Sequence, residues 1–360
     1  MKASSPKKSK IIGEIEKKAA LLGLSRLGEA GRSLRFMELC GTHSQAVARY
    51  GIKGLLPKNV KLLSGPGCPV CVTDQEDVDI LVGLALSGVP IAAYGDAINV
   101  PGNKLSLDQA RQQGAQVFTV YDVMQALALK KKYPKLVFWG LGFETTTPMT
   151  AWAIKNGLTV FSSHKIFPPA MAALLKNKEI KIDGFIDPGH VSAIIGTEVY
   201  KKFKVPQVIA GFGAEDVLNA IDKLLDQLIR KEYLVENEYG RVVRRQGNRK
   251  AQKIIVEVFE IGDAKWRGLG MIKKSGLKIK KKYRSQDASW VYRQAIKKIR
   301  QTIKHRPTGC RCGLVLQGVI ESTECPLFAK VCTPENPKGA CMVSVEGSCN
   351  VEYRYGKNKR

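Results

Sequence analysis

Two stretches of the sequence, LRFMELCGTH (Leu34–His43) and VKLLSGPGCPVC (Val60–Cys71), share one pattern. Each begins with a short apolar run typical of a buried β-strand and ends in a loop that carries glycine and cysteine. A helical segment follows each loop, and this alternation predicts parallel strands joined by helices. Ligand-binding loops lie at the carboxyl ends of such strands. We therefore expect the two cysteine loops to meet in one cleft.

The alternation continues to about residue 235. Further apolar runs, each ending in a polar loop or followed by a helix, cover residues 90–94, 116–120, 135–140, 158–162, 183–186 and 206–210. They form two blocks, so we predict two similar parallel-sheet α/β domains, residues 31–130 and 131–235, around a central cleft. Residues 1–30 are predicted to add an N-terminal amphipathic helix, and residues 236–360 a basic segment and a small C-terminal iron–sulfur domain.

The composition indicates an ordinary globular protein of 360 residues, 44% of them hydrophobic. No run of about 18 apolar residues exists, so no membrane-spanning helix is expected. The basic N-terminus lacks the apolar core of a secretory signal, and we expect a cytoplasmic location. Clustered cysteines there serve more often as metal ligands or redox groups than as structural disulfides. An odd total, nine, also argues against a fully paired disulfide framework.

The net charge is +26, and lysine and arginine are densest between Arg241 and Arg284. Such a stretch can bind nucleic acid, but it can also form a solvated surface or dock acidic proteins. Aromatic residues are not interleaved with the charges as they are on a base-stacking surface. We therefore expect no nucleic-acid partner.

Four C-terminal cysteines, Cys325, Cys332, Cys341 and Cys349, are spaced widely and regularly. Four thiolates suit either zinc or a [4Fe–4S] cluster. Zinc sites usually contain tight Cys-x-x-Cys knuckles, and their absence here favours the cluster, with buried or paired cysteines as a third interpretation. The upstream Cys310 and Cys312 could be ligands, a regulatory pair or inert.

The N-terminal cysteines indicate thiol chemistry. Cys68 and Cys71 have the spacing of a thiol–disulfide redox pair, and the alternative, half of a metal knuckle, lacks a second pair nearby. Cys40 stands just before a predicted helix, which predicts a lowered thiol pKa. His43 would lie on the same side, and the two could bind iron or act in nucleophilic catalysis, or simply be buried core residues.

Two further loops carry polar groups at predicted strand ends. Glu144, Thr145 and Thr146 precede a helix and could bind an anion or a partner's backbone, although a helix cap explains one neighbouring threonine. Asp187 and His190 offer a second carboxylate–imidazole pair, or else an Asx-type turn with an exposed histidine.

Together these motifs resemble the HypD family of hydrogenase maturation factors. The matching segments run in order along most of the chain: CGTHS (40–44), GPGCPVCVT (65–73), YGD (94–96), GFETT (142–146), HK (164–165), PPAM (168–171), PGHVS (188–192), WRGLG (266–270), CPLF (325–328) and GACMVS (339–344).

The resemblance implies a scaffold and redox protein on which the Fe(CN)2CO unit of [NiFe]-hydrogenase is assembled. It implies a HypC-type chaperone that shares the iron, and HypE as the cyanide donor, which presents thiocyanate. On this basis Cys40 resembles the iron-ligating thiolate, with His43 as its helper. Cys68 and Cys71 resemble a thioredoxin-type pair. The [4Fe–4S] ligands would be Cys325, Cys332, Cys341 and Cys349.

Other expectations follow from the resemblance less directly. Glu144, Thr145, Thr146 and His190 are expected to contact partners in the cleft. The protein alone is expected to be a monomer, and whether it turns over without partners stays open. The alternative functions are a general iron–sulfur thiol-disulfide oxidoreductase and, from charge alone, a zinc-stabilised nucleic-acid-binding protein.

Overall fold

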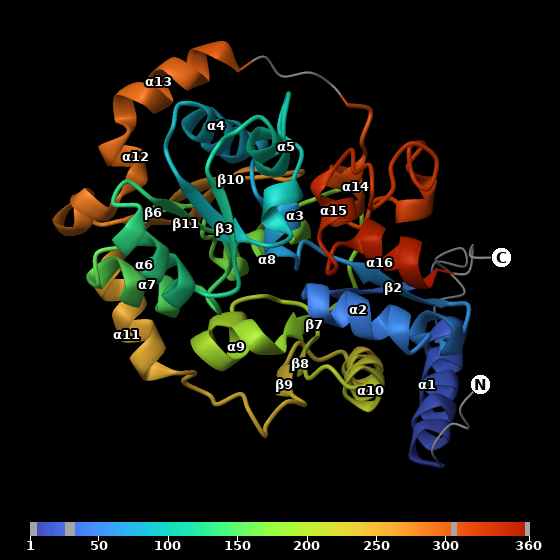
Figure 1. Cartoon of the computed structure of the whole chain (residues 1–360). Helices are drawn as coiled ribbons and strands as arrows, with labels where there is room; N and C mark the ends of the chain where they lie inside the picture. Colours follow the sequence, from blue (N-terminus) through green and yellow to red (C-terminus); the bar gives the residue numbers. More distant parts are fainter. Residues whose placement is uncertain (1–5, 26–32, 304–307, 357–360) are drawn as a thin grey trace.

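A computed structural model describes residues 6–25, 33–303 and 308–356 and contains two parallel β-sheets (Figure 1). The five-stranded sheet has the order β2-β1-β7-β8-β9, and the four-stranded sheet has the order β4-β3-β5-β6. The strands of the five-stranded sheet are β1 (Leu34–Glu38), β2 (Val60–Ser64), β7 (Gly184–Pro188), β8 (Gln207–Ala210) and β9 (Val235–Asn237). Those of the four-stranded sheet are β3 (Ile91–Tyr94), β4 (Val117–Val120), β5 (Val137–Gly140) and β6 (Thr159–Ser162). The predicted α/β class with parallel sheets is confirmed.

The two sheets do not divide the chain at residues 130 and 131 as expected. That boundary falls inside α6 (Val123–Lys132), between β4 and β5, which belong to the same sheet. The whole four-stranded sheet is inserted between β2 and β7 of the five-stranded sheet. The strands of both sheets show the same local pattern of apolar residues. The sequence pattern therefore could not predict which sheet each strand joins.

Helices connect the strands and cover the outer faces. The helices of the N-terminal half are α1 (Pro6–Ser25), α2 (Gly41–Arg49), η1 (Ile52–Leu55), α3 (Pro69–Val72), α4 (Gln75–Leu86), η2 (Ala97–Asn99), α5 (Leu107–Gln112) and α6. Those that follow are α7 (Thr147–Lys155), α8 (Phe167–Leu175), α9 (Gly189–Ile195), η3 (Glu198–Tyr200) and α10 (Ala214–Arg230). The expected N-terminal helix is present as α1, and its predicted extension over residues 26–30 lies outside the described residues.

Side chains that alternate along the strands bury two different faces of the five-stranded sheet. Phe36 and Ile186 point into a core with α1 and α10, which uses Ile15 and Leu224 among others. Met37, Leu39, Phe185 and Ile209 point the other way, into a larger core that they share with Ala93 and Trp139 of the four-stranded sheet. The inner faces of the two sheets therefore share one core, because successive residues of a strand face opposite sides.

The last third of the chain begins with an antiparallel hairpin, β10 (Phe259–Trp266) and β11 (Gly270–Ile279), preceded by α11 (Arg249–Val258). Short elements follow: η4 (Lys281–Gln286), α12 (Ala288–Val291), α13 (Arg293–Thr302), α14 (Cys312–Leu316), η5 (Ser322–Glu324), α15 (Ala340–Val343) and α16 (Ser348–Tyr355). Figure 1 shows α14, α15 and α16 gathered beside α2 and α3, and contacts join α16 to α2 and α15 to α3.

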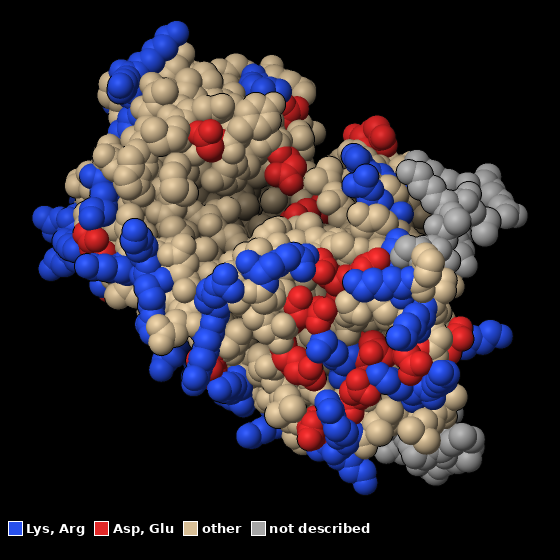
Figure 2. All heavy atoms as spheres, turned by 90° about the horizontal axis from the view of Figure 1, so that it is seen from below, with Lys and Arg blue, Asp and Glu red and all other residues tan. Residues whose placement is uncertain are grey.

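On the face shown in Figure 2, lysine and arginine side chains are interspersed with aspartate and glutamate, and a hollow opens between parts of the molecule. Uncharged residues form most of the visible wall of this hollow. No helix within the described residues is long and apolar enough to span a bilayer.

Candidate functional site

The two N-terminal cysteine loops meet because β1 and β2 are adjacent parallel strands, with Glu38 paired to Ser64 at their ends. Cys40 is the N-cap of α2, and the Gly41 amide donates to the Gly67 carbonyl at 3.2 Å. A β-carbon on Gly67 would collide with the backbone of Cys40, so only glycine permits this approach. The structure therefore brings Cys40 and the Cys68–Cys71 segment together.

Cys68 and Cys71 are bonded to each other as a disulfide, with 5.2 Å between their α-carbons. They bracket the start of α3, and the Cys71 amide donates to the Cys68 sulfur at 3.2 Å. Both are buried, with exposed fractions of 3% and 0%. Two sulfurs bonded to each other are not metal ligands, so this geometry favours the redox interpretation over half of a metal knuckle.

The Cys40 thiol is buried, and its pKa is raised to about 12, chiefly by desolvation and then by the nearby Glu346 carboxylate, with a smaller contribution from Glu38. The predicted lowered pKa is therefore wrong. Backbone amides of the first turn of α2 do stabilise the thiolate, but burial and two acidic neighbours outweigh them. Near pH 7 this sulfur carries its proton.

His43 is fully buried, and its Nε2 donates to the carbonyls of Ala210 and Gly211 at 3.2 and 2.9 Å. Burial lowers its pKa to about 4, so the ring is neutral near pH 7. The Nδ1 atom has no hydrogen-bond partner among the described residues. A neutral imidazole with a free lone pair can accept a hydrogen bond or bind a metal.

The Phe212 ring links His43 to His190, with ring centroids 4.8 Å and 4.0 Å away. His190 is exposed, whereas Asp187 is fully buried and neither of its carboxylate oxygens has a partner within the described residues. The expected carboxylate–imidazole pair of Asp187 and His190 is therefore not formed. Burial raises the pKa of Asp187 well above its usual range.

Glu144 is buried at the end of β5, where one carboxylate oxygen accepts from the Phe167 amide at 3.0 Å. Its second oxygen has no partner in the described part of the chain, and burial raises its pKa to about 7. Thr146 is the N-cap of α7 and donates to the Leu141 carbonyl at 3.3 Å, and Thr145 is half-buried beside it.

Burial raises the pKa of the Tyr200 hydroxyl well above its usual range, and nearby Asp187, Glu144 and Cys40 add to this shift. Three of the singled-out loops thus share one neighbourhood, although they come from both sheets. Sequence reasoning had named the loops but not this tyrosine, which has no unusual local motif.

Glu38 was missed as well. It is the residue before Leu39 in the Cys40 loop, and its buried carboxylate accepts from the Cys40 amide at 3.1 Å and from the Ser44 hydroxyl. Desolvation raises its pKa to about 7, although these hydrogen bonds oppose the shift. An acidic residue inside an otherwise apolar strand was the available signal.

All six C-terminal cysteines line one small cavity, formed by Cys310, Cys312, Cys325, Cys332, Cys341 and Cys349. Cys312 is hydrogen-bonded to Cys310 and Cys341, and Cys341 also to Cys349. The Lys338 amide donates to the Cys332 sulfur at 3.3 Å. Within the described residues, no three His, Cys, Asp or Glu side chains are arranged for a single metal ion. A [4Fe–4S] cluster would take one thiolate per iron, so four of these six cysteines could hold it.

The cysteine cavity is attached directly to the N-terminal loops. The Thr42 hydroxyl donates to Glu346 at 2.7 Å, and the Gln45 amide donates to the Val345 carbonyl at 3.1 Å. The Cys71 sulfur lies 4.0 Å from the Ala340 carbonyl oxygen, next to Cys341. The two groups of cysteines therefore form adjoining parts of one site.

Arg267 adds a further connection from the tip of the hairpin. Its backbone amide donates to the Val72 carbonyl at 2.9 Å and its Nε to the Thr73 carbonyl at 2.8 Å, just after the disulfide. The same guanidinium lies within electrostatic range of Cys312 and helps to lower the pKa of that thiol, although hydrogen bonds from Cys310 and Cys341 contribute more.

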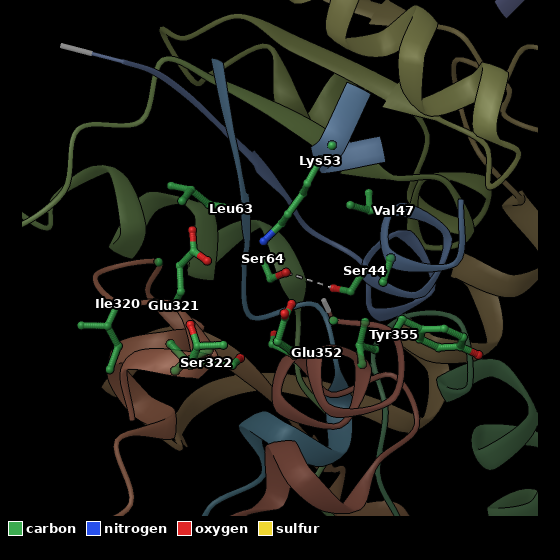
Figure 3. Close-up of a pocket in the computed structure, with 18 of the residues that line it drawn as sticks. Ser44, Val47, Lys53, Leu63, Ser64, Ile320, Glu321, Ser322, Glu352 and Tyr355 are labelled. Carbon is green, nitrogen blue, oxygen red and sulfur yellow. Dashed lines mark hydrogen bonds between the residues drawn. The ribbon is translucent and has the colours of Figure 1, made fainter. Parts of the chain in front are cut away.

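A pocket of about 430 Å³ opens behind these two groups, between α2 and α16 (Figure 3). Its wall includes Ser44, which binds Glu38, and Ser322, which is hydrogen-bonded to Cys349. Figure 3 shows the Ser44 and Ser64 hydroxyls, 3.5 Å apart, and the Lys53 side chain extending toward them.

Comparison with known proteins gives a consistent result. Residues 15–356 match the family model described as "HypD: Hydrogenase formation hypA family". A putative hydrogenase expression/formation protein of Methanocaldococcus jannaschii is 42% identical over 352 residues, covering 94% of this chain and 96% of that protein. The hydrogenase maturation factor HypD of Escherichia coli is 41% identical over 341 residues, with 91% and 90% covered. HypD2 of Bradyrhizobium diazoefficiens is 40% identical over 374 residues, with 97% of each chain covered.

Proposed function

The chain belongs to the HypD family of hydrogenase maturation factors, and on that premise we propose that it is a scaffold and redox protein for assembling the Fe(CN)2CO unit of [NiFe]-hydrogenase. The observation that carries this proposal is the meeting of three sulfur centres. A single thiol at Cys40, a dithiol pair at Cys68 and Cys71, and a cavity with six thiols adjoin one another.

Cys40 is proposed to hold the iron under construction. Thiolate is a soft, electron-rich ligand of the kind that suits iron carrying cyanide and carbon monoxide. Because the pKa of this thiol is about 12, binding the metal must displace a proton. His43 lies in the first turn of α2, three residues after Cys40, and its neutral ring has no hydrogen-bond partner at Nδ1 among the described residues.

Cys68 and Cys71 are proposed to supply the electrons that release cyanide. When a carrier R–S–C≡N gives up cyanide, its S–C bond breaks, and the products R–SH and HCN need two electrons and two protons. Oxidation of the dithiol to a disulfide supplies both, so atoms and charges balance. The disulfide in this structure corresponds to the pair after the transfer.

Cys325, Cys332, Cys341 and Cys349 are proposed to hold a [4Fe–4S] cluster, and they line one cavity together with Cys310 and Cys312. Such a cluster supplies electrons one at a time. The Lys338 amide, which donates to the Cys332 sulfur, is positioned to stabilise a thiolate there. The Cys71 sulfur lies beside Ala340, the residue before Cys341.

The partners are proposed to be a HypC-type chaperone that shares the iron and HypE as the cyanide donor. Exposed His190 and half-buried Thr145 and Thr146 are accessible to such partners. A general thiol-disulfide oxidoreductase is the alternative function; it would use the Cys68–Cys71 pair alone and would not need Cys40.

Infrared spectroscopy tests the proposal. The protein is co-purified anaerobically with its HypC-type partner from cells that make the other maturation factors. We expect cyanide and carbonyl stretching bands from the wild-type complex and their loss in Cys40→Ser, with iron–sulfur absorbance near ~400 nm unchanged as an internal control. Bands that persist in Cys40→Ser would reject Cys40 as the iron ligand, and an oxidoreductase centred on Cys68 and Cys71 would tolerate that substitution.

A further inference from the structure

The proposed function leaves most of the positive charge of this protein unexplained. The net charge is +26, and lysine and arginine are frequent over residues 280–300, far from the cysteine loops in the sequence. Figure 1 shows α12 and α13, from the second half of this basic region, on the opposite side of the molecule from α14, α15 and α16. A second pocket of about 370 Å³ opens beside α12 and α13, and its volume lies in the range of small-molecule sites.

The charged side chains that line this second pocket are all positive. Arg293, Lys297 and Arg300 extend from one face of α13, at positions i, i+4 and i+7. The other polar lining residues, Ser289 and Gln301, carry no charge. Because none of the lining residues is acidic, the pocket attracts anions.

Two of the three cations have no counter-ion within the part of the chain that the structure describes. The Arg300 Nε is paired with the Glu76 carboxylate at 2.7 Å. Arg293 donates to the Trp290 carbonyl at 3.1 Å and its guanidinium lies 4.7 Å from the centroid of that ring, but no described carboxylate forms an ion pair with it. Lys297 likewise has no ion pair or hydrogen bond among the described residues. An anionic ligand would supply the missing counter-charge.

The nearest further carboxylate does not neutralise the pocket. Asp287 is the N-cap of α12 and accepts from the Ser289 amide at 2.9 Å, so it is already engaged by the backbone, and it is not part of the lining. Arg293 and Lys297 are one helical turn apart, with about 6 Å between their positions along the axis. Two linked anionic groups on one ligand can therefore meet one cation each.

The inner wall of the pocket is apolar and offers no open aromatic face. It contains Phe161 and Ile296, with exposed fractions of 5% and 4%. The nearby Trp290 ring is contacted by the guanidinium groups of both Arg284 and Arg293. A nucleotide base would find no free ring on which to stack, whereas an aliphatic group can lie against the inner wall.

We propose that this pocket binds a small aliphatic anion that carries two or more carboxylate or phosphate groups. Its anionic groups pair with Arg293 and Lys297, and its aliphatic part lies against Ile296. The inference goes beyond the proposed function and does not depend on it, because no cysteine and no residue of the cysteine loops lines the pocket. A failure of the infrared experiment would leave it intact, and the reverse also holds.

Isothermal titration calorimetry on the full-length protein tests the proposal, with inorganic phosphate, citrate, tripolyphosphate and ATP as probes at low ionic strength. We expect citrate and tripolyphosphate to bind at least about tenfold more tightly than inorganic phosphate, and ATP to bind no more tightly than tripolyphosphate. Equal affinity for all four anions would overturn the proposal, since it would indicate only a diffuse positive field. Tighter binding of ATP would overturn the aliphatic class of ligand.

Two neighbouring lysines provide matched variants. Lys297 and Lys298 are both exposed on α13, and each substitution by glutamine removes one charge, but only Lys297 lines the pocket. Lys297→Gln should weaken citrate binding about tenfold, whereas Lys298→Gln should weaken it less than about twofold. Equal weakening in the two variants would overturn the proposal, because net charge rather than the pocket would then explain the binding.

A second measurement needs no variant. Wild-type protein is treated with an acetylating reagent with and without saturating citrate, and peptide fragmentation reads the two adjacent lysines separately. We expect citrate to slow acetylation of Lys297 and to leave Lys298 unchanged. An unchanged rate at Lys297 would overturn the proposal.

Discussion

The two cysteine regions of this protein are held in place by different means. The loops of Cys40 and Cys68 extend from adjacent parallel strands, whose backbone pairing fixes where they end. The six-cysteine cavity is built instead from short segments, α14, η5, α15 and α16, with no strand among them. The comparison shows that the first region is ordered by the sheet itself, whereas the second depends on contacts between loops and, we infer, on its cofactor.

Replacing Gly67 with alanine should give the largest effect on the first region. The new methyl group would collide with the Cys40 backbone, which is part of a hydrogen-bonded turn and cannot move away easily. We expect a loss of about 3 kcal/mol in the free energy of unfolding, measured with urea. Gly240→Ala is the matched control, because nothing lies within 4 Å of its added β-carbon. Equal stability of the two variants would show that Gly67 is not packed tightly against the Cys40 backbone.

Removing the proposed [4Fe–4S] cluster should affect the second region and spare the first. Chelation of iron under reducing conditions should speed amide hydrogen exchange in residues 308–356 on the order of 10- to 100-fold. The strands β1, β2, β7 and β8 should keep their protection, because their hydrogen bonds involve no cofactor. Uniform loss of protection across both regions would contradict the distinction.

Asp187 offers a sharper test of how the sheet region tolerates polar groups. The pKa of the Asp187 carboxyl is higher in the folded state than in the unfolded state. The folded state therefore gains most from this group below about pH 4, where the carboxyl is protonated, and loses that stability as the pH rises. Asp187→Leu should therefore raise the free energy of unfolding by roughly 1–2 kcal/mol at pH 7, and by less at pH 4.

The matched control for this prediction is Asp183→Leu, four residues earlier. Asp183 is also buried, but it accepts from the Arg35 amide at 2.8 Å, so the same substitution should destabilise the protein. Urea titrations at pH 4 and pH 7 would measure both variants. Destabilisation by Asp187→Leu at pH 7 would mean that its carboxyl group is satisfied in solution.

The smallest effect concerns the contact between the two regions. Glu346 raises the pKa of Cys40, so Glu346→Gln should lower that pKa and speed alkylation of Cys40 by iodoacetamide at pH 8 about two- to threefold. Glu352→Gln, in the neighbouring helix α16, should leave the rate unchanged. Equal rates in all three proteins would show that desolvation alone sets the thiol pKa.

Much of the strand pattern could be predicted from the sequence. The apolar runs that open the stretches Leu34–His43 and Val60–Cys71 correspond to β1 and β2. Strand pairing could not be predicted in the same way, because β1 finds its second neighbour, β7, far along the chain. Local periodicity reports which residues form strands and not which strands pair.

The site was predicted in its residue types more than in its electrostatics. The cysteines, His43 and Glu144 could be named because unusual residues cluster at strand ends. The pKa of Cys40 could not, because one of the groups that raises it is Glu346, whose side chain is fixed by Thr42 from 304 positions away. Burial is likewise a property of the assembled fold. The position of Cys40 at a helix N-terminus therefore predicted a lowered thiol pKa, whereas burial raises it.

The insertion of one sheet into the other has a consequence for biosynthesis. As the ribosome releases the chain, β1 and β2 emerge first, yet β7 follows only after all four strands of the other sheet. The inserted unit can finish pairing while the nascent β1 still exposes an unfilled edge, which is the kind of surface that promotes misassembly. We expect translation speed and chaperone supply across residues 65–183 to govern the yield of active protein.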